Sequence, residues 1–520
     1  METIVLVGSW FSPGLLVILI AACVCLLCMN ASKGSTTTHI PGPKRWPIFG
    51  NALSIDRNAH VTFTKWAKTY GSVIGVKLGP MNVVVLNDLQ SIESAFTKSG
   101  GILNRPAPGL LKAAFSNDGS LLWENGEKWK ETRKFVLRFL HDFKQQKLIK
   151  LLNFESGKLC DLIRQHNGAA IDVCQPINMA VSNVLCALCF GHRFEYDDDN
   201  FRSLLSNLQA LGKSVSGTTI GHFLPFLYYT PLYSNFRNLA TSFTDFIDGE
   251  ISQHIESYDP INVRDLIDAF LTDEVELDRV PNKRTETRVR RAIIDMFASG
   301  TDTTSTALEW SILYMTQYTE QQKAVSEIFQ TFVILITIKR EVDDVTRQHQ
   351  LLTLQSYYEK LPYTQATIME VLRHANVSPL GLPRKVSKPM SIQGHLFPHD
   401  SWVFANLWAV HHDEQYWNDP TNFRPERFLS VEKKTVISSK AFMPFGLGRN
   451  LHNTNCELTD LCKRCCVGEK IAMSTIIVIL SKIMQEFNFK IPEEDPKPSL
   501  VGINGLTLSP APFRVCAVPR

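Results

Sequence analysis

The sequence predicts a mainly α-helical fold with a small β part, arranged as a single domain behind an N-terminal membrane anchor. Three observations predict it: an uncharged apolar run near the N-terminus, long stretches with the hydrophobic period of a helix, and few, short strand-like runs. The chain has 520 residues and a formal net charge of +3, and no Lys/Arg block is dense enough to contact nucleic-acid phosphates. Nucleic-acid binding is therefore not expected.

The anchor is predicted from residues 11–29, an apolar run close to the ~20 residues that a membrane-spanning helix needs. A cleavable signal peptide is the alternative, but such peptides begin with basic residues, and the only early charged side chain here is Glu2. Lys33 and further basic residues follow the run, and a basic flank stays in the cytosol. We expect residues 1–30 to form the anchor and the rest of the chain to lie on the cytosolic side.

A proline-rich hinge is expected over residues 31–55, because each proline fixes its own φ and restricts the residue before it. A generic proline-rich spacer would look the same. Residues 56–520 contain no Pro/Gly/Ser linker, so we expect them to form one catalytic domain. The helices expected in it cover residues 59–69, 127–140, 287–318 and 469–486, and the strands cover residues 71–78, 82–86 and 391–396.

The strongest chemical signal lies near the C-terminus, where a glycine-rich loop contains Phe445 and an apolar helix begins just after Cys466. Backbone N–H groups and the helix dipole at a helix start favour a thiolate over a thiol. Gly468 removes a side chain where a flat group has to lie close. A thiolate is also the ligand that promotes O–O cleavage by haem iron. Cys466 is therefore a candidate axial ligand of haem iron.

Two further motifs make this interpretation more specific. Glu370 and Arg373 are three residues apart and face the same side of a helix, with Arg427 as a candidate third member of a buried triad. Taken alone, the first two would be an ordinary surface pair.

The second motif, residues 297–304, places Gly300 and several hydroxyl residues inside a long helical pattern, where they are unfavourable. Asp302 next to Thr303 can deliver protons to dioxygen, and the missing side chain of Gly300 would leave room above a haem. An incidental glycine that bends the helix is the alternative.

Together these stretches resemble a cytochrome P-450 of the microsomal type of animals. The resemblance covers nearly the whole chain and includes the anchor, the hinge, the segment from Trp129 to Arg133 and the motifs above, in the family's order. It implies the cytochrome P-450 fold and a haem b cofactor (iron protoporphyrin IX), with Cys466 as the axial ligand of the iron. It also implies a location on the endoplasmic reticulum membrane, with the catalytic domain on the cytosolic face.

The resemblance assigns roles residue by residue. The positions that match haem-contacting residues of the family are Trp129, Arg133, Arg384, Phe445, Arg464, Cys466 and Gly468. Asp302 and Thr303 match the pair that handles oxygen and its protons. Glu370, Arg373 and Arg427 match the triad that holds the fold around the haem-binding loop.

Partners and substrate also follow from the resemblance. Electrons would come from NADPH–cytochrome P-450 reductase, with cytochrome b5 as a second donor, at a basic helix face formed by Lys130, Lys134 and Arg138. A solvated basic face without a partner is the alternative. The substrate would be lipophilic, such as a steroid, a fatty acid or a foreign compound. The segments expected to recognise it are residues 108–122, 223–233, 294–299, 377–382 and 503–508, with Ser378, Asn504 and Thr507 as polar anchors.

The sequence departs from the family pattern at two apparent insertions, residues 331–340 and 449–462. The hypothesis is that both are retained untranslated sequence or splice variation and that an active form lacks them. Peptides from within residues 449–462 in mass spectra of the native protein would contradict it. The second insertion separates the glycine-rich loop from Cys466, and the fixed geometry of a metal ligand makes such an insertion a concern for haem binding.

The second insertion also gathers His452, Cys456 and Cys462 near Cys465 and Cys466, which raises the alternative of a zinc site. The paired short spacings typical of zinc sites are incomplete here. All the cysteines except Cys466 are expected to be reduced thiols that act as small hydrophobic side chains.

The leading functional hypothesis is a reductase-dependent monooxygenase that inserts one oxygen atom into its substrate. A haem-thiolate isomerase or dehydratase is the second, and the pair of Asp302 and Thr303 argues against it, because such an enzyme has little use for proton delivery to dioxygen. The third is a non-catalytic, haem-deficient membrane protein that results from the insertions.

Overall fold

The computed structural model describes residues 40–98, 102–143, 145–215, 219–276, 283–320, 337–343, 353–432, 435–447 and 464–520. The expected anchor, residues 1–30, lies outside these residues. Among the helices that are described, none combines the length and the apolarity that a membrane crossing requires. The expected insertion 449–462 also lies outside, whereas the last four residues of 331–340 belong to a helical stretch over residues 337–343.

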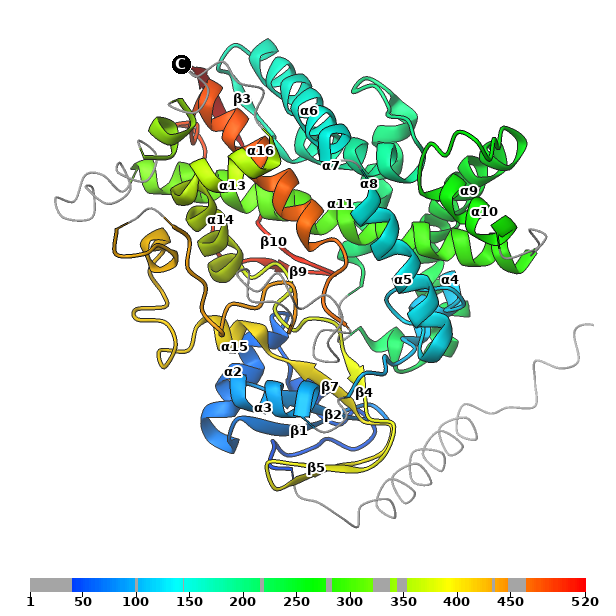
Figure 1. The fold of residues 1–520 in the computed structure, drawn as a ribbon. Coiled ribbons are helices and arrows are strands. Elements are labelled where there is room, and N and C mark those ends of the chain that lie inside the picture. The colour runs from blue at the N-terminus through cyan, green and yellow to red at the C-terminus, as the bar shows by residue number, and fades with distance from the viewer. Residues whose placement is uncertain are drawn as a thin grey trace, which may run out of the picture.

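Helices dominate the fold (Figure 1). The α-helices are α2 (Ala59–Tyr70), α3 (Leu89–Glu93), α4 (Gly109–Phe115), α5 (Gly126–Asp142), α6 (Gln145–Gln165), α7 (Cys174–Cys189), α8 (Asp199–Lys213), α9 (Ser234–Glu256), α10 (Leu266–Glu276), α11 (Lys283–Glu320), α13 (Leu354–Lys360), α14 (Pro362–Ala375), α15 (Leu407–His411) and α16 (Glu469–Glu486). Short helical turns are η1 (Ala52–Ser54), η2 (Ser94–Lys98), η3 (Ile220–His222), η4 (Pro225–Tyr229), η5 (Pro231–Tyr233) and η7 (Pro425–Phe428). The four helices expected from the sequence are confirmed within a few residues at each end.

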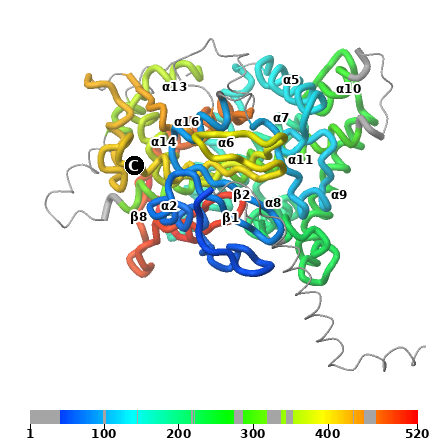
Figure 2. The backbone as a smooth tube through the Cα atoms, turned by 90° about the horizontal axis from the view of Figure 1, so that it is seen from below, coloured from blue at the N-terminus to red at the C-terminus, as the bar shows by residue number. Residues whose placement is uncertain are grey.

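The strands are β1 (Val73–Leu78), β2 (Met81–Leu86), β3 (Ala170–Ile171), β4 (Arg384–Lys385), β5 (Met390–Ile392), β6 (His395–Phe397), β7 (Trp402–Ala405), β8 (Phe487–Lys490), β9 (Ile503–Asn504), β10 (Leu508–Ser509) and β11 (Val515–Pro519). The largest sheet has the order β1-β2-β7-β4, with β2 and β7 parallel. In Figure 1 this sheet lies below the helical part, and Figure 2, seen from below, shows it in front of the helices.

Two expectations about strands require correction. Residues 391–396 do not form one strand: β5 and β6 pair as a hairpin, because Gln393 and Gly394 both have positive φ and make a tight turn. Strand β7 was not expected, although it is central. All four of its residues are buried, so it lacks the alternation of apolar and polar residues by which a strand is recognised.

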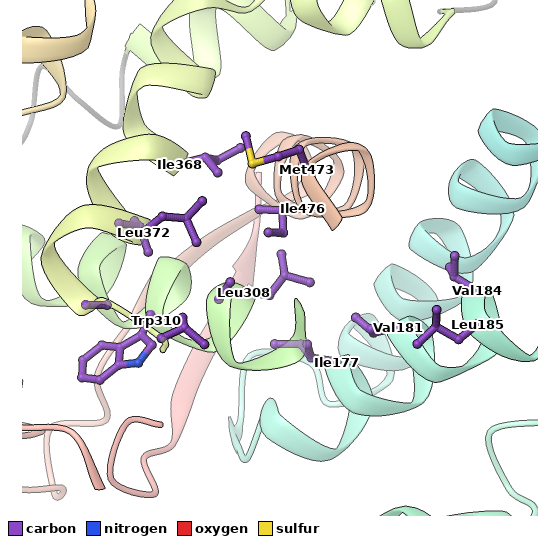
Figure 3. Packing of buried hydrophobic residues seen from close by; sticks show 14 of the residues in the cluster. Ile177, Val181, Val184, Leu185, Leu308, Trp310, Ile368, Leu372, Met473 and Ile476 are labelled. Carbon is purple, nitrogen blue, oxygen red and sulfur yellow. The ribbon is translucent and has the colours of Figure 1, made fainter. Parts of the chain in front are cut away.

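The core forms where α11 packs against α7, α14 and α16 (Figure 3). Each of these helices directs buried apolar side chains into the shared space, for example Val181 of α7, Leu308 of α11, Leu372 of α14 and Ile476 of α16. Such side chains recur every three or four residues, which is the pattern that buries one helix face or more. α11 is therefore held rigidly from several sides along its length, and it carries the motif that contains Asp302 and Thr303.

Candidate functional site

Cys466 lies in a loop that closes against the glycine-rich segment before it. The Cys466 N–H donates to the Phe445 carbonyl oxygen (3.1 Å). Gly446, next to Phe445, has φ +86°, a left-handed conformation that glycine adopts at no steric cost. Helix α16 begins three residues after Cys466, with Gly468 at its N-cap. The hydrogen bond joins the two ends that flank residues 449–462.

The Cys466 thiol is exposed and yet surrounded by protein. Burial raises the pKa of Cys466 to about 11, and a hydrogen bond from the Gly468 N–H opposes this shift without cancelling it. The sequence predicted that a backbone N–H group would lower the pKa of Cys466. This hydrogen bond is present, but burial raises the pKa by more than the hydrogen bond lowers it. A metal cation at the sulfur would supply the charge that deprotonates such a thiol.

Four arginines from distant parts of the chain gather beside the Cys466 loop: Arg105, Arg133, Arg384 and Arg464. Burial lowers the pKa of Arg105, and the charges of the other three arginines lower it further. Burial also lowers the pKa of Arg384 to about 10 and that of Arg464 to about 9. The four positive charges are therefore close enough to repel one another in a poorly hydrated place.

Within the described residues, no carboxylate forms a hydrogen bond or ion pair with Arg105, Arg384 or Arg464. Backbone carbonyl oxygens hold them instead: Arg105 Nη1 donates to Pro383 (2.8 Å), Arg384 Nη1 to Ile102 (3.0 Å) and Arg464 Nε to Leu103 (3.0 Å). The buried Arg105 Nε and Arg464 Nη1 atoms have no hydrogen-bond partner among the described residues. Because buried cations are costly without counter-charge, the cluster suits an anionic group.

Arg133 and Arg464 connect helix α5 with the loop that contains Cys466. Arg133 Nη2 donates to the carbonyl oxygen of Cys465 (2.8 Å) and contacts its sulfur (3.4 Å). The Arg464 guanidinium lies 3.5 Å from the ring centroid of Trp129, a cation–π contact. The Trp129 ring N–H itself donates to the Leu121 carbonyl oxygen (3.2 Å). The arginines, Trp129 and Cys466 therefore belong to one site.

Glu370, Arg373 and Arg427 meet in a buried group. Glu370 bonds to both arginines, with Oε2 at 2.7 Å from Arg373 Nε and Oε1 at 3.1 Å from Arg427 Nε. Arg373 Nη1 donates to the carbonyl oxygen of His411 (2.7 Å). His411 Nε2 accepts the Met443 N–H (3.0 Å), and burial keeps this histidine neutral by lowering its pKa. The group is thereby linked to the start of the loop that leads to Cys466.

The motif on α11 places Asp302 and Thr303 side by side, with different partners. Thr303 Oγ1 donates to the Ser299 carbonyl oxygen one turn earlier (2.7 Å). Asp302 Oδ2 accepts from Thr507 Oγ1 (2.8 Å), so Thr507, expected as a substrate anchor, is bonded to Asp302. Burial raises the pKa of Asp302, which favours the protonated form that a proton donor needs.

The interpretation of Gly300 was wrong. A Cβ atom at this position would lie 2.9 Å from Leu185 Cδ1 of α7. The missing side chain therefore allows α7 and α11 to approach each other closely, and it does not provide room for a bound group. An interhelical contact of this kind is invisible in the local sequence.

The zinc alternative depends on His452, Cys456 and Cys462, which lie outside the described residues. In the part of the chain that the structure describes, a single group of three potential metal-binding side chains occurs: His254, Asp265 and Asp268. His254 Nε2 is 2.9 Å from Asp265 Oδ2, and Asp268 pairs with Arg264, so each of the three side chains already has a polar partner in the protein.

Comparison with known proteins places this site in a family. The family model for cytochrome P450 matches residues 40–517. The chain belongs to the cytochrome P450 family. It is 32% identical to human cytochrome P450 2J2 over 92% of this chain and 91% of that protein. It is also 32% identical to rat cytochrome P450 2J3 (98% of this chain, 97% of that protein) and 29% identical to rat cytochrome P450 2D3 (95% of each).

Cytochromes P450 bind haem, and the residues of this P450 fit that group. Haem carries two propionate carboxylates, and the arginine cluster offers buried donors without a carboxylate partner in the described chain. A Cβ atom at Gly468 would meet no described atom within 4 Å other than Cys466 Sγ, at 3.9 Å, and one at Gly446 would meet none. Open space thus adjoins the accessible sulfur. The predicted cytochrome P450 fold, mainly α-helical with a small β part, and the predicted haem cofactor are confirmed.

The basic face expected to bind the reductase is less positive than the sequence suggested. Lys130, Lys134 and Arg138 are exposed on α5 as expected. However, Lys130 pairs with Glu127 (2.5 Å) and Arg138 pairs with Asp273 (3.3 Å). Two of the three cations are therefore compensated within the P450 itself.

Sequence reasoning missed Arg105 and His411. The signal for Arg105 was faint: a lone arginine before Pro106 in a segment with no acidic neighbour. His411 shares the dipeptide His411–His412, and only the structure tells which of the two meets the Met443 N–H.

We expect Arg384→Gln to weaken haem binding. The substitution removes a charge-assisted contact to an anionic group, worth about 1.5–3 kcal/mol, or roughly 10- to 100-fold in affinity. Haem transfer from the P450 to apomyoglobin measures the change. The control is Arg514→Gln, which removes an exposed ion pair with Asp495 and should leave haem binding unaltered. Equal transfer from both variants would contradict a role for Arg384 at the haem.

Proposed function

We propose that this P450 is a monooxygenase that inserts one atom of dioxygen into a lipophilic substrate, with electrons from NADPH–cytochrome P-450 reductase. The observation that carries the proposal is an exposed Cys466 sulfur beside a cluster of buried arginines, of which Arg105, Arg384 and Arg464 form no hydrogen bond or ion pair with a carboxylate of the described residues. Haem bound there would supply the activation of dioxygen. Cys466 would hold it from one side, and Arg105, Arg133, Arg384 and Arg464 would bind its carboxylates.

The remaining site residues have two roles in this proposal: Asp302 and Thr303 would hold and move protons, and the buried triad would maintain the shape of the site. Asp302, with its raised pKa, would give a proton on the side of α11 where Thr303 lies. Glu370, Arg373 and Arg427 would hold the loop before Cys466 through His411. This supply of protons favours dioxygen chemistry over the isomerase or dehydratase alternative.

Membrane association is part of the proposal. Apart from the predicted anchor, Trp46, Phe49 and Leu53 expose large apolar surfaces, and so do Phe226, Tyr229 and Leu232 in η4 and η5. Both groups flank a common apolar cluster in which Phe223 packs against Trp402 of β7. Exposed apolar patches of this kind mark interaction surfaces. These patches support association with a membrane, and we propose that it is the endoplasmic reticulum membrane, with the catalytic domain on the cytosolic face.

The domain boundaries also remain a proposal: an anchor over residues 1–30, a hinge over 31–55 and the catalytic domain over 56–520, with 331–340 and 449–462 absent from an active form. The substrate class proposed is a steroid, a fatty acid or a xenobiotic, with cytochrome b5 as a second electron donor. The hydrogen bond from the Cys466 N–H to the Phe445 carbonyl oxygen supports such an active form, because it holds the segments on either side of residues 449–462 close together.

The reduced carbon-monoxide difference spectrum tests the proposal, recorded for the chain as written and for a form without residues 449–462. We expect the Soret band of a thiolate-ligated haem in the shortened form, and NADPH consumed in proportion to the product. Product formation without NADPH would favour the isomerase or dehydratase. No haem band in either form would leave the haem-deficient protein as the remaining interpretation.

A further inference from the structure

A buried carboxyl, that of Glu309, lies on the same helix as the partly buried Asp302 and has no role in the function proposed above. Seven residues separate Asp302 and Glu309 on α11, which is about two helical turns, so both side chains project from the same face. Glu309 is 6% exposed. None of the ion pairs among the described residues includes either carboxyl. Since an unpaired buried charge is costly, this pair is expected to hold protons.

Hydroxyl groups fill the helix face between the two carboxyls. Thr507 Oγ1, from the turn between β9 and β10, donates to Asp302 Oδ2 (2.8 Å). Thr507 Oγ1 also lies 3.5 Å from Thr306 Oγ1. Thr306 is four residues after Asp302 and three before Glu309, so it lies on α11 between them. A hydroxyl can accept one proton and donate another, which makes it a suitable intermediate for proton transfer.

The other side of Glu309 leads toward solvent. Glu309 lies near Cys174, the first residue of α7, and near Asp172, close enough for both to affect its pKa. The Cys174 N–H donates to Asp172 Oδ1 (2.8 Å), and Asp172 is exposed. Lys213, at the end of α8, is exposed as well, and its charge is near enough to lower the pKa of both Asp302 and Glu309. Glu309 therefore lies between solvent-exposed charged groups and Asp302.

The electrostatics agree with this arrangement. Burial, and after it the carboxylates of Asp302 and Asp172, raise the pKa of Glu309 to about 8, although Lys213 and Cys174 oppose the shift. Burial likewise raises the pKa of Asp302. At neutral pH Glu309 thus carries its proton in most molecules.

We propose that Glu309 stores a proton and that this proton replaces the one that Asp302 donates. Asp172 then passes a proton from solvent to Glu309. When Asp302 loses its proton toward Thr303, the proton of Glu309 passes through the Thr306 and Thr507 hydroxyls, each of which accepts one proton and releases one. Glu309 becomes an anion and then takes a proton from the side of Asp172. No electrons move in these steps. The inference rests on the proposed monooxygenase function, which consumes protons at Thr303.

Infrared spectroscopy of the purified full-length chain tests whether Glu309 holds a proton, without substrate or reductase. We expect a protonated-carboxyl C=O band that fades as the pH rises through about 8. Glu309→Gln should lack it. Glu286→Gln, at an exposed position near the start of α11, is the matched control and should keep it. A band that persists unchanged in Glu309→Gln overturns the proposal.

The pH dependence of stability gives a second test of whether Glu309 holds a proton. Glu309 has a pKa of about 8 in the folded protein and of 4.5 in the unfolded chain. The folded state therefore binds more protons between these pH values, and the free energy of unfolding falls as the pH rises from about 4.5 to about 8. Glu309→Gln should remove this part of the decline in melting temperature, whereas Glu286→Gln should retain it.

Turnover tests the use of the proton. In reconstituted P450, Glu309→Gln should keep the haem content and the carbon-monoxide spectrum, while product formation at pH 7 falls on the order of tenfold and its solvent deuterium isotope effect grows. Glu309→Asp should restore most of the rate, and it also serves if the glutamine variant fails to fold. Unchanged turnover and isotope effect in Glu309→Gln overturn the proposal. A wild-type chain without haem would instead overturn the proposed function, and the infrared band would still decide whether Glu309 holds a proton.

Discussion

Cys466→Ser should abolish the thiolate-type haem spectrum, whereas Cys465→Ser should retain it. A serine hydroxyl is a poor substitute for a thiolate, the ligand that sets the spectrum of such a haem. The two cysteines are neighbours, but Cys466 is the exposed one and Cys465 contacts Arg133. The reduced carbon-monoxide difference spectrum and the haem content of the two purified variants measure the effect.

The neighbouring cysteine makes this comparison a stringent one. Both variants lose one thiol from the same loop, so general damage to the loop would affect both in the same way. A Cys466→Ser protein that keeps the wild-type spectrum would contradict the ligand assignment. Loss of the spectrum in Cys465→Ser alone would transfer the assignment to Cys465.

Arg373→Ala should lower the free energy of unfolding by about 3–5 kcal/mol, because it leaves the fully buried Glu370 without its main partner. The change also removes donors to the carbonyl oxygens of His411 and Pro420. A loss of this size is a large fraction of the stability of a typical domain. Urea denaturation of the purified protein measures it, and haem content should fall in parallel, since His411 supports the loop before Cys466.

The matched control is Arg202→Ala in α8. Arg202 and Asp199 form a pair with the same three-residue spacing as Arg373 and Glu370, but on the surface. Its removal should cost about 0.5 kcal/mol or less. Equal destabilisation by the two substitutions would show that the buried triad contributes no more than an ordinary surface pair.

The long helices could be predicted from sequence because their signal is local and repeated. α2, α5, α11 and α16 each show many turns of hydrophobic period. Short strands carry no such repetition. β7 could not be predicted because its four buried residues show no alternation, and its parallel partner β2 comes from a remote part of the chain.

The candidate site likewise contains some residues that could be predicted from the sequence and others that could not. Cys466, Arg464 and Glu370 could be predicted because short motifs surround them. The addition of Arg105 to the arginine cluster depends on how distant segments fold together, and so does the contact of Gly300 with Leu185. The pKa of Cys466 shows a further limit, since the favourable N–H group is local whereas the desolvation that outweighs it comes from the whole surrounding protein.

The parallel pairing of β2 with β7 has a consequence for biosynthesis. The hairpin of β1 and β2 leaves the ribosome early, whereas Trp402–Ala405 emerges only after most of the chain has been made. During that interval β2 presents a free strand edge, which is a template for non-native pairing. The sheet can close only after synthesis has passed β7, so chaperone protection of the nascent hairpin should matter more for this protein than for one whose strands are neighbours in sequence.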